Sequence, residues 1–536
     1  MKESVSAPKL PFSGMVGTYS DRQKIITETL GIAALAVLVA VITNWRWVGY
    51  QGHDDFYYTM AAFDWIENFP AVGANHWALR YPLVVSMAAS LTGYGYHIAS
   101  LGIPNLVAFL TYLIVQYWAV RRWIGALAAA IATLLAITLP QFAVQATYAN
   151  PDLIEMTFVM TSFWLFIASW RAKLKSQSFW LIASGLLAGV GFITRETSVA
   201  LILVYGLFFV FCPRMPRVRY LLIAVGFVVV FGAQTAYLAA RTGDLLYRQQ
   251  ISATHDVVDR SSKASDAATS GAAVDNEGVL AVRPLFAPFA AIFVSQKYGI
   301  LFILALPAMV WVPLTGRLTK LQREVVDGVS ICGLVSFVFV AASANILYIV
   351  PRYFMVAAAC SLVVLAVFLA DLVHRRGALR VFGLLACTAM VSSSLFLLYL
   401  ENIDPMRSEK EIIGYASLQA EPLSVDPETY ARLTVFLRLM PSAPNVVQLP
   451  PRAGGLVAVT EGVIEQCASK IGCGFRERNV PFTVKPDWKL VEKMEPPLRD
   501  IAALLRIAGV ERFISRDILR KIEQPGLAVS IYRRPA

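Results

Sequence analysis

Two adjacent carboxylates, Asp54 and Asp55, open an aromatic segment directly behind the first apolar run of the chain. The segment reads GHDDFYY (52–58) and includes Tyr58. A charge close to hydrocarbon has to be solvated by a cavity or by a partner, so acids at that depth are rare and point to function. We therefore expect chemistry at the membrane surface here. The alternative interpretation is that the two acids only mark the end of a helix at the lipid headgroups.

Two more acids lie at the start of a later apolar run. Asp152 follows Asn150 and Pro151, which suit the N-cap and the first position of a helix. An acid in the first turn is favoured by the helix dipole, so capping alone can explain Asp152. Glu155 would lie one turn deeper on the same face of that helix, and capping does not account for it.

Three arginines accompany these acids. Arg80 and Arg352 each precede an apolar segment, and Arg195 is followed directly by Glu196. Singly, such an arginine is commonly an interfacial anchor, and the Arg195–Glu196 pair is also compatible with a plain polar hairpin. Together, acids can deprotonate a hydroxyl, and arginines can hold a phosphate by charge-assisted hydrogen bonds. That combination suits the transfer of a group from a lipid phosphate.

The composition places the chain in a membrane. Of its 536 residues, 57% are hydrophobic and 15% are charged, which excludes an ordinary soluble protein. We predict an all-α polytopic bundle of about 11–13 transmembrane helices, because apolar runs long enough for hydrocarbon of about 30 Å recur along it. Two half-length apolar stretches, 82–93 and 285–295, are predicted to be interfacial or re-entrant. The full-length runs lie near 25–43, 98–120, 123–143, 153–170, 179–193, 197–212, 219–240, 297–314, 326–343, 353–371 and 379–400.

The basic residues predict the orientation. They gather in pairs and triplets in the short connections on one side, as at Arg121-Arg122 and Arg375-Arg376. The positive-inside rule then places a tail, 1–24, in the cytoplasm, and the loops 44–97 and 241–296 outside. The net charge of +11 reflects this topology. Because the charges form no stripe on a single face, we expect no nucleic-acid partner.

The chain changes character after the membrane domain, 25–400. Residues 401–536 are rich in charge and in proline joints, and they are predicted to fold as a soluble α/β domain on the outer side, with a helix at 498–509 and strands at 510–514 and 528–532. Cys467 and Cys473 lie in this region, and in an oxidising compartment a disulfide between them is expected. This segment supplies too few ligands for a metal site.

The motifs, in their order along the chain, resemble those of polyprenyl-phosphate-sugar-dependent glycosyltransferases of the C superfamily (GT-C), especially aminoarabinose lipid A transferases and protein O-mannosyltransferases. The resemblance covers about residues 20–400. Arginine stands at 80 and 195, where that family more often has lysine, and the second acid of the first pair is Asp. The matching elements are Asp54-Asp55, Arg80-Tyr81-Pro82-Leu83, Gly93-Tyr94-Gly95, Arg121-Arg122, Asp152, Thr194-Arg195-Glu196 and Arg352-Tyr353.

The resemblance implies a glycosyltransferase of the inner membrane that works on its outer face. It implies an inverting attack in which an acceptor hydroxyl, with Asp54 as base, displaces polyprenyl phosphate from the sugar. Asp54, Asp55 and Asp152 are then the candidate catalytic residues. The expected partners are membrane lipids, the polyprenyl-phosphate-sugar donor, and a lipid, glycan or protein acceptor. The candidate substrate-binding residues are Tyr58, Arg80, Glu155, Arg195, Glu196, Arg352 and Tyr353.

Two alternatives stay open at this point. A transporter or flippase for a lipid-linked sugar would also need a polar cavity and arginines, although the two halves of the chain show no internal repeat. A sensor or scaffold that displays the C-terminal domain would not need acids at membrane depth. The sequence specifies no cofactor, and a divalent metal ion stays an open alternative.

Overall fold

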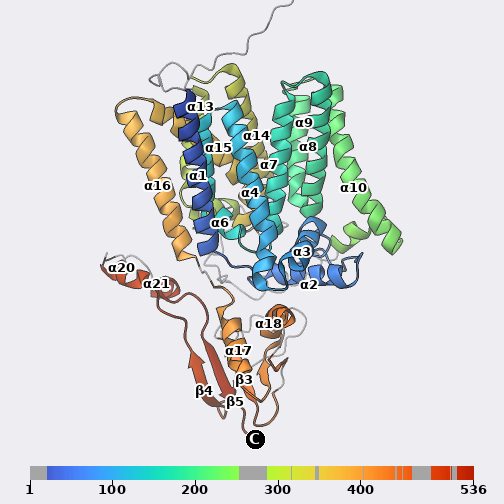
Figure 1. Ribbon diagram of the computed structural model, residues 1–536, viewed down its shortest axis with the longest axis vertical. Coiled ribbons are helices and arrows are strands. Elements are labelled where there is room, and N and C mark those ends of the chain that lie inside the picture. Colours follow the sequence, from blue (N-terminus) through green and yellow to red (C-terminus); the bar gives the residue numbers. More distant parts are fainter. Residues whose placement is uncertain are drawn as a thin grey trace, which may run out of the picture.

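A computed structural model provides the fold. It describes residues 21–252, 286–314, 317–343, 349–401, 404–440, 444–448, 451–460, 484–507, 509 and 516–536. Helices dominate up to residue 400, and a small sheet lies in the C-terminal region (Figure 1). Cys467, Cys473 and the predicted strand 510–514 lie outside the described residues.

Each of the eleven predicted apolar runs coincides with an apolar helix. In the described part of the chain, eight helices are long and apolar enough to cross a membrane, and three more are shorter. The protein is therefore a multi-pass membrane protein. The eight are α1 (Asp21–Trp45), α4 (Ile98–Trp123), α7 (Pro151–Ser169), α8 (Leu174–Thr194), α10 (Leu221–Thr242), α14 (Lys320–Ala342), α15 (Met355–His374) and α16 (Ala378–Leu400). The shorter three are α5 (Ala126–Thr138), α9 (Val199–Val210) and α13 (Leu301–Leu314).

The two half-length stretches do not span the bundle. The first forms α3 (Tyr81–Tyr94), which lies with α2 (Asp54–Glu67) across one end of the helices (Figure 1). The described part of the second is a short helical turn, α12 (Ala287–Phe289), continued by a π-helical turn (Ala290–Val294). The same end of the bundle also carries a short helix, α6 (Pro140–Gln145).

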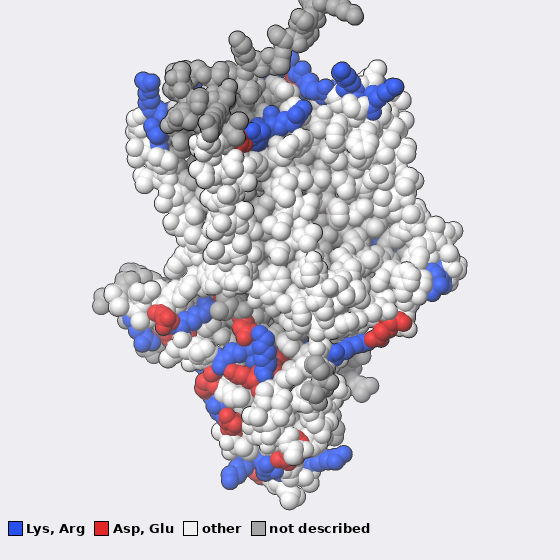
Figure 2. All heavy atoms as spheres, viewed as in Figure 1, with Lys and Arg blue, Asp and Glu red and all other residues white. Residues whose placement is uncertain are grey.

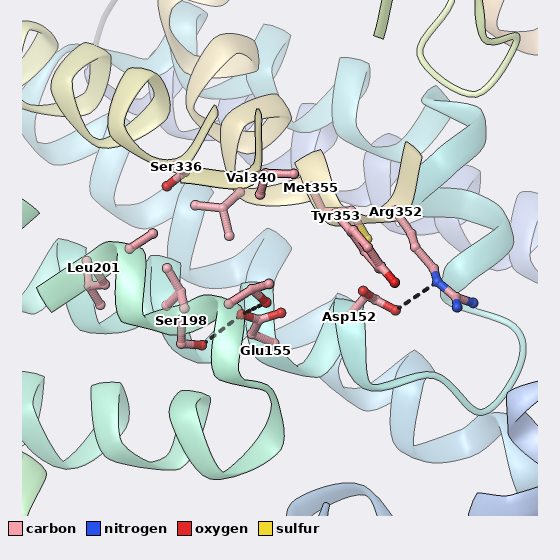
Figure 3. Close-up of a pocket in the computed structure, with 13 residues that line it drawn as sticks. Asp152, Glu155, Ser198, Leu201, Ser336, Val340, Arg352, Tyr353 and Met355 are labelled. Atoms are coloured by element: carbon pink, nitrogen blue, oxygen red, sulfur yellow. Dashed lines mark hydrogen bonds and ion pairs between the residues drawn. The ribbon is translucent and has the colours of Figure 1, made fainter. Parts of the chain in front are cut away.

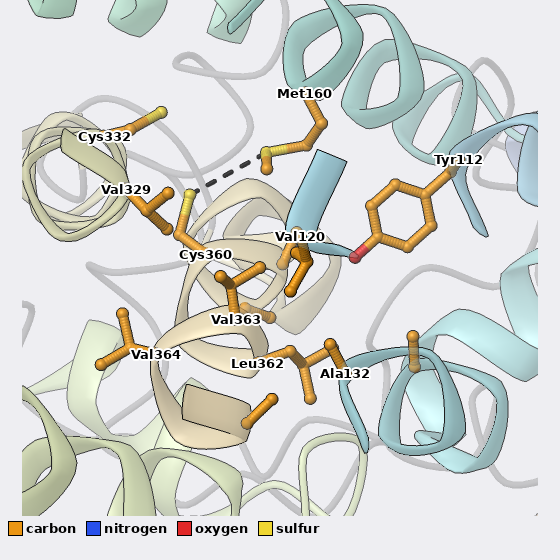
Figure 4. Close-up of a cluster of buried hydrophobic side chains, with 14 of the residues drawn as sticks. Tyr112, Val120, Ala132, Met160, Val329, Cys332, Cys360, Leu362, Val363 and Val364 are labelled. Atoms are coloured by element: carbon orange, nitrogen blue, oxygen red, sulfur yellow. Dashed lines mark hydrogen bonds between the residues drawn. The ribbon is translucent and has the colours of Figure 1, made fainter. Parts of the chain in front are cut away.

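Helix α15 is the centre of the bundle. It packs among α5, α7, α13 and α14. In its most apolar stretch 83% of the residues are buried, whereas only 22% are buried in the most apolar stretch of α16. Small side chains let the helices approach closely in this core, where Cys360 lies 3.9 Å from the Met160 sulfur and beside Cys332 (Figure 4). Both thiols are buried, as expected of cysteines that act as small hydrophobes.

Glycines permit one close helix pair. A Cβ on Gly185 of α8 would lie 2.0 Å from the carbonyl oxygen of Ile223 in α10, and a Cβ on Gly226 would lie 2.3 Å from that of Ile182. Backbones in contact at this distance accept no side chain, which is a common device of membrane helices. This pairing fixes α8, whose last turn leads into the Arg195 segment.

The C-terminal region forms a mixed five-stranded sheet with helices, as predicted. The strand order is β2-β1-β3-β5-β4, with β1 parallel to β2 and β3, and β5 antiparallel to β3 and β4. The predicted C-terminal helix is present, as is the last strand. The elements are α17 (Arg407–Ser417), β1 (Leu423–Val425), α18 (Pro427–Leu439), β2 (Val446–Gln448), β3 (Leu456–Thr460), β4 (Lys489–Met494), α20 (Ile501–Ile507), α21 (Arg516–Glu523) and β5 (Val529–Arg533).

The distribution of charge supports the predicted orientation. On the face shown in Figure 2, a band with hardly any charged side chains crosses the bundle, with mainly Lys and Arg at the end remote from the C-terminal region and both signs of charge at the other end. The positive-inside rule predicts that the mainly basic end faces the cytoplasm.

A pair of reporter fusions tests this orientation. A reporter fused after Leu318 should behave as cytoplasmic, and one fused after Glu401 should behave as exported. The physical reason is that three apolar helices, α14, α15 and α16, lie between these two points. Alkaline phosphatase and green fluorescent protein activities measure the two locations. Reporters that both read the same side would contradict the topology and move the candidate site to the other face.

Candidate active site

The first acid pair begins helix α2. Asp54 and Asp55 occupy its first turn, where the helix dipole favours negative charge. The chain reaches them through a segment with positive φ at Gly49 (75°) and Gly52 (76°), a conformation that glycine adopts without strain. The pair therefore sits at the end of a tightly bent connection between α1 and α2.

The two acids face different partners. The Asp55 side chain is buried and turns back into its own loop, where its carboxylate accepts hydrogen bonds from the backbone N–H groups of Gln51 and His53, the latter at 2.7 Å. Burial raises the pKa of Asp55 to about 6, and the two backbone donors limit that rise. Asp55 therefore holds the loop in shape, and Asp54 is the one directed at the rest of the site.

Asp54 forms an ion pair with an arginine from a distant part of the sequence. Arg352 Nη2 lies 2.7 Å from Asp54 Oδ2. Burial alone would raise the pKa of Asp54, but the positive charges of Arg352 and Arg80 outweigh it and lower that pKa below its ordinary value. Asp54 is consequently ionised at neutral pH.

Arg352 also connects Asp54 to the second acid site. Its Nε lies 3.7 Å from Asp152 Oδ2, and Figure 3 shows the two side chains pointing toward each other. Asp152 is only 3% exposed and forms a second ion pair with Arg195. The guanidinium of Arg195 in turn lies 4.2 Å from the centre of the Tyr353 ring.

Besides Asp54 at the start of α2, three separate segments contribute to this network. Asp152 comes from the start of α7, where Asn150 accepts a hydrogen bond from the Asp152 N–H as the predicted N-cap. Arg195 comes from the turn after α8, and Arg352 and Tyr353 come from the 3₁₀ turn that leads into α15. Capping and ion pairing therefore both apply to Asp152.

Arg80 and Tyr58 adjoin the network. Arg80, the N-cap of α3, donates a hydrogen bond of 2.6 Å from Nη1 to the Tyr58 hydroxyl. Burial raises the pKa of Tyr58 to about 12, so its hydroxyl keeps its proton at neutral pH. This pair lies between α2 and α3, close enough for the charge of Arg80 to act on Asp54.

Glu155 lines a narrow slot beside Asp152. The slot leads from Asp152 and Arg352 toward apolar side chains such as Leu201 and Val340 (Figure 3). Glu155 accepts hydrogen bonds from the hydroxyls of Thr197 (2.6 Å) and Ser198 (2.9 Å). Its carboxylate is thus buried but hydrogen-bonded, as a polar group at this depth has to be.

Glu196 faces a partner that the sequence did not indicate. It forms an ion pair with Arg248, which is 7% exposed and also donates to the Gln234 side chain at 2.9 Å. From the sequence, Arg248 is one of several basic residues in the predicted outer loop 241–296, and nothing distinguishes it as a site residue. Thr197 and Ser198 were missed as well. Their position directly after Arg195-Glu196 is the signal that could have identified them.

The structure thus brings most of the predicted residues to one place. Asp54, Asp152, Arg195, Arg352 and Tyr353 are directly connected, whereas Asp55 and Glu196 turn to other partners. In the described part of the chain, no three His, Cys, Asp or Glu side chains gather in a manner that could hold a metal ion. The acids of the network are arranged to meet arginines instead.

Comparisons with known proteins bear on the family and on the fold. Residues 74–237 match the family model of dolichyl-phosphate-mannose-protein mannosyltransferase, which is less than half of the chain. No curated protein is similar enough in sequence to match.

Solved structures show the same architecture. The chain is similar to ArnT from Cupriavidus metallidurans in its apo state, with 13% identity, a TM-score of 0.56 and coverage of 88% of this chain and 97% of ArnT. ArnT bound to undecaprenyl phosphate gives 13% identity, a TM-score of 0.55 and coverage of 84% and 96%. The oligosaccharyltransferase of Archaeoglobus fulgidus in its apo form gives 12% identity, a TM-score of 0.55 and coverage of 94% of this chain and 88% of that one. The chain therefore has the fold of these membrane glycosyltransferases, and the resemblance predicted from the sequence is confirmed at the level of the fold.

Proposed function

We propose that this protein transfers a sugar from a polyprenyl-phosphate-linked donor to an acceptor hydroxyl on the outer face of the inner membrane, with inversion and with Asp54 as base. The observation that carries the proposal is the ion network of Asp54, Arg352, Asp152 and Arg195 at one end of the bundle. It combines a carboxylate held in the ionised form with arginines suited to a phosphate. The fold neighbours include one bound to undecaprenyl phosphate.

The reaction assigns each side chain a step. Asp54 takes the proton from the acceptor hydroxyl as its oxygen attacks the anomeric carbon. The bond from that carbon to the phosphate oxygen breaks, and polyprenyl phosphate leaves with the bonding electrons. The negative charge that develops on the leaving oxygen is stabilised by the guanidinium groups of Arg352, Arg195 and Arg80.

Arg352 has a second role in this scheme. It contacts Asp54 at 2.7 Å, and the donor phosphate competes for the same guanidinium. Donor binding would therefore draw Arg352 from Asp54 and leave the carboxylate free to accept a proton. Asp152 keeps Arg195 and Arg352 in place, because a buried arginine without an acid partner would be costly. Glu155 and Tyr353 lie along the slot and orient the substrates.

The partners follow from the same site. The site lies at the level where helices α2 and α3 cover the bundle, so a lipid donor can keep its chain among the helices and present its phosphate to the arginines. The acceptor is a lipid, a glycan or a protein that brings a hydroxyl to Asp54 from the outer side. Membrane lipids are the remaining expected partners.

Substitution of Asp54 tests the assignment of the base. Asp54→Asn keeps the size of the side chain but cannot accept the proton, so single-turnover transfer should fall by about 10²–10⁴-fold. The assay uses a labelled polyprenyl-phosphate sugar in nanodiscs, with donor binding measured separately. Asp55→Asn is the matched control and should be milder, because that side chain holds the loop through backbone contacts. A folded Asp54→Asn protein that transfers sugar at the parent rate would rule out Asp54 as the base. Translocation of the lipid-linked sugar without transfer would favour a transporter.

Substitution of Arg352 tests the phosphate contact. Arg352→Ala should weaken donor binding by about 10–100-fold, because a charge-assisted hydrogen bond contributes about 1.5–3 kcal/mol. Arg352→Lys should recover part of that loss in donor affinity, since lysine restores the positive charge but not the paired N–H donors of a guanidinium. Arg241→Ala, which removes an exposed arginine that donates a hydrogen bond to the Pro70 carbonyl, is the matched control. Equal donor affinity in the Arg352→Ala and Arg241→Ala proteins would disprove the assignment.

The pH dependence should reflect Asp55. Its pKa is raised to about 6, whereas that of Asp54 is lowered. As pH falls through 6, Asp55 gains a proton and loses acceptor capacity for the backbone N–H groups, so the transfer rate should fall while Asp54 is still ionised. Single-turnover rates between pH 5 and 8 measure this. The fall in rate below about pH 6 should be absent in Asp55→Asn. The same fall in that variant would contradict the attribution of the pH dependence to Asp55.

A further inference from the structure

The segment that carries the acid pair lies between the bundle and the C-terminal region. On the bundle side, the Gly49 N–H donates to the Thr147 carbonyl at 2.7 Å, and Gly49 pairs with Tyr148 as an isolated parallel bridge. A Cβ on Gly49 would lie 2.6 Å from the Ile98 carbonyl oxygen. The backbone therefore touches the bundle directly, with no room for a side chain.

On the opposite side, α18 of the C-terminal region contacts the same segment. Tyr50 is 1% exposed, and its ring meets the Phe436 ring edge-on with centroids 5.7 Å apart. Its hydroxyl donates to the Arg432 carbonyl at 3.4 Å. A Cβ on Gly52 would lie 2.7 Å from the Met406 sulfur and 2.8 Å from Arg432 Nε. Two residues before Asp54, the chain is again too close to its neighbours to accept a side chain.

The α18 side of this contact is itself held in place. Arg432 Nη2 lies 2.9 Å from Glu409 Oε1, and Glu409 is 1% exposed. Arg432 and Phe436 are one helical turn apart and share a face of α18. The buried side chains of α2, α3 and the C-terminal region form a single hydrophobic cluster, which includes Tyr50, Tyr58 and Phe436. The two parts of the protein are thus joined by a common core at this site.

A second contact at the far end of α2 has a different character. Arg438 forms an ion pair with Glu67 and lies 4.4 Å from the centre of the Phe63 ring. Both charged side chains are substantially exposed, at 32% and 55%. Surface ion pairs of this kind contribute little stability, and α2 places this one about 20 Å from Asp54.

We propose that helix α18 is a positioning element of the active site, whose Phe436–Arg432 face presses the segment 49–52 against the bundle and so sets the direction of Asp54. The proposal rests on the proposed transferase function. The physical link is short: Gln51 and His53 supply the N–H groups that hold Asp55, and Asp54 follows directly. A displacement of a reacting group by about 1 Å can cost about 10²-fold in rate. The C-terminal region thus completes the site without touching the substrate.

Three variants of the full-length protein test the positioning role. Phe436→Leu and Tyr50→Leu each keep an apolar side chain but remove the ring contact. We expect single-turnover transfer to fall by about 10–100-fold in each, with donor affinity within about twofold of the parent. The double variant should be no slower than the slower single variant, because both changes remove the same contact. Arg438→Ala, at the far end of α2, is the matched control and should stay within about twofold.

Hydrogen–deuterium exchange provides a readout that does not depend on the reaction. The amides of residues 49–56 should exchange faster in Phe436→Leu and Tyr50→Leu than in Arg438→Ala, while those of strand β3 stay protected and show that the C-terminal region is folded. If Phe436→Leu unfolds that region, Tyr50→Leu, which lies outside it, still decides. A parent protein that does not transfer sugar would defeat the proposed function, but the exchange would still test the contact. Unchanged exchange at 49–56 together with control-like transfer would overturn the positioning role.

Discussion

Burying an ionised acid at the edge of a membrane requires a cationic partner, and the whole site is organised around that constraint. Asp152 is 3% exposed and lies beside two arginines, from the turn after α8 and from the start of α15. Removing Arg195, the nearer of the two, would leave Asp152 with only the more distant Arg352 to offset its buried charge, which is far more costly than losing an exposed pair. Because Asp152 and its two arginine partners come from three segments, the ion network fixes the relative positions of α7, α8 and α15.

The same constraint explains how function and stability share residues. Arg352 neutralises Asp152 and Asp54 together, and in the proposed mechanism it also receives the donor phosphate. A negatively charged substrate can therefore enter without creating an unpaired charge, because it replaces one carboxylate as the partner of the guanidinium. Contacts from outside the bundle complete the arrangement, since α18 packs against the segment that leads to Asp54.

Much of the fold could be predicted from the sequence because its signals are local. Apolar runs identified the helices, and Asn150-Pro151-Asp152 identified the start of α7 through the side-chain cap that the structure contains. The separation of Asp54 and Asp55 into a site-facing acid and a loop-holding acid could not be predicted, because it depends on the backbone conformation at Gly49 and Gly52.

Long-range pairing was the other limit. Nothing in the sequence associates Arg352 with Asp54, or Arg248 with Glu196, since these pairs form only when distant helices pack. The contact of Phe436 with Tyr50 joins residues from opposite ends of the chain and was equally invisible. The predicted bridge between Cys467 and Cys473 stays a prediction, because both lie outside the described residues.

The most direct test is a cryo-electron microscopy structure of the protein with polyprenyl phosphate bound. The account predicts phosphate density against the guanidinium of Arg352 and a distance from Arg352 Nη2 to Asp54 Oδ2 well above its present 2.7 Å. Phosphate bound at another place, with the ion pair between Arg352 and Asp54 intact, would contradict the account.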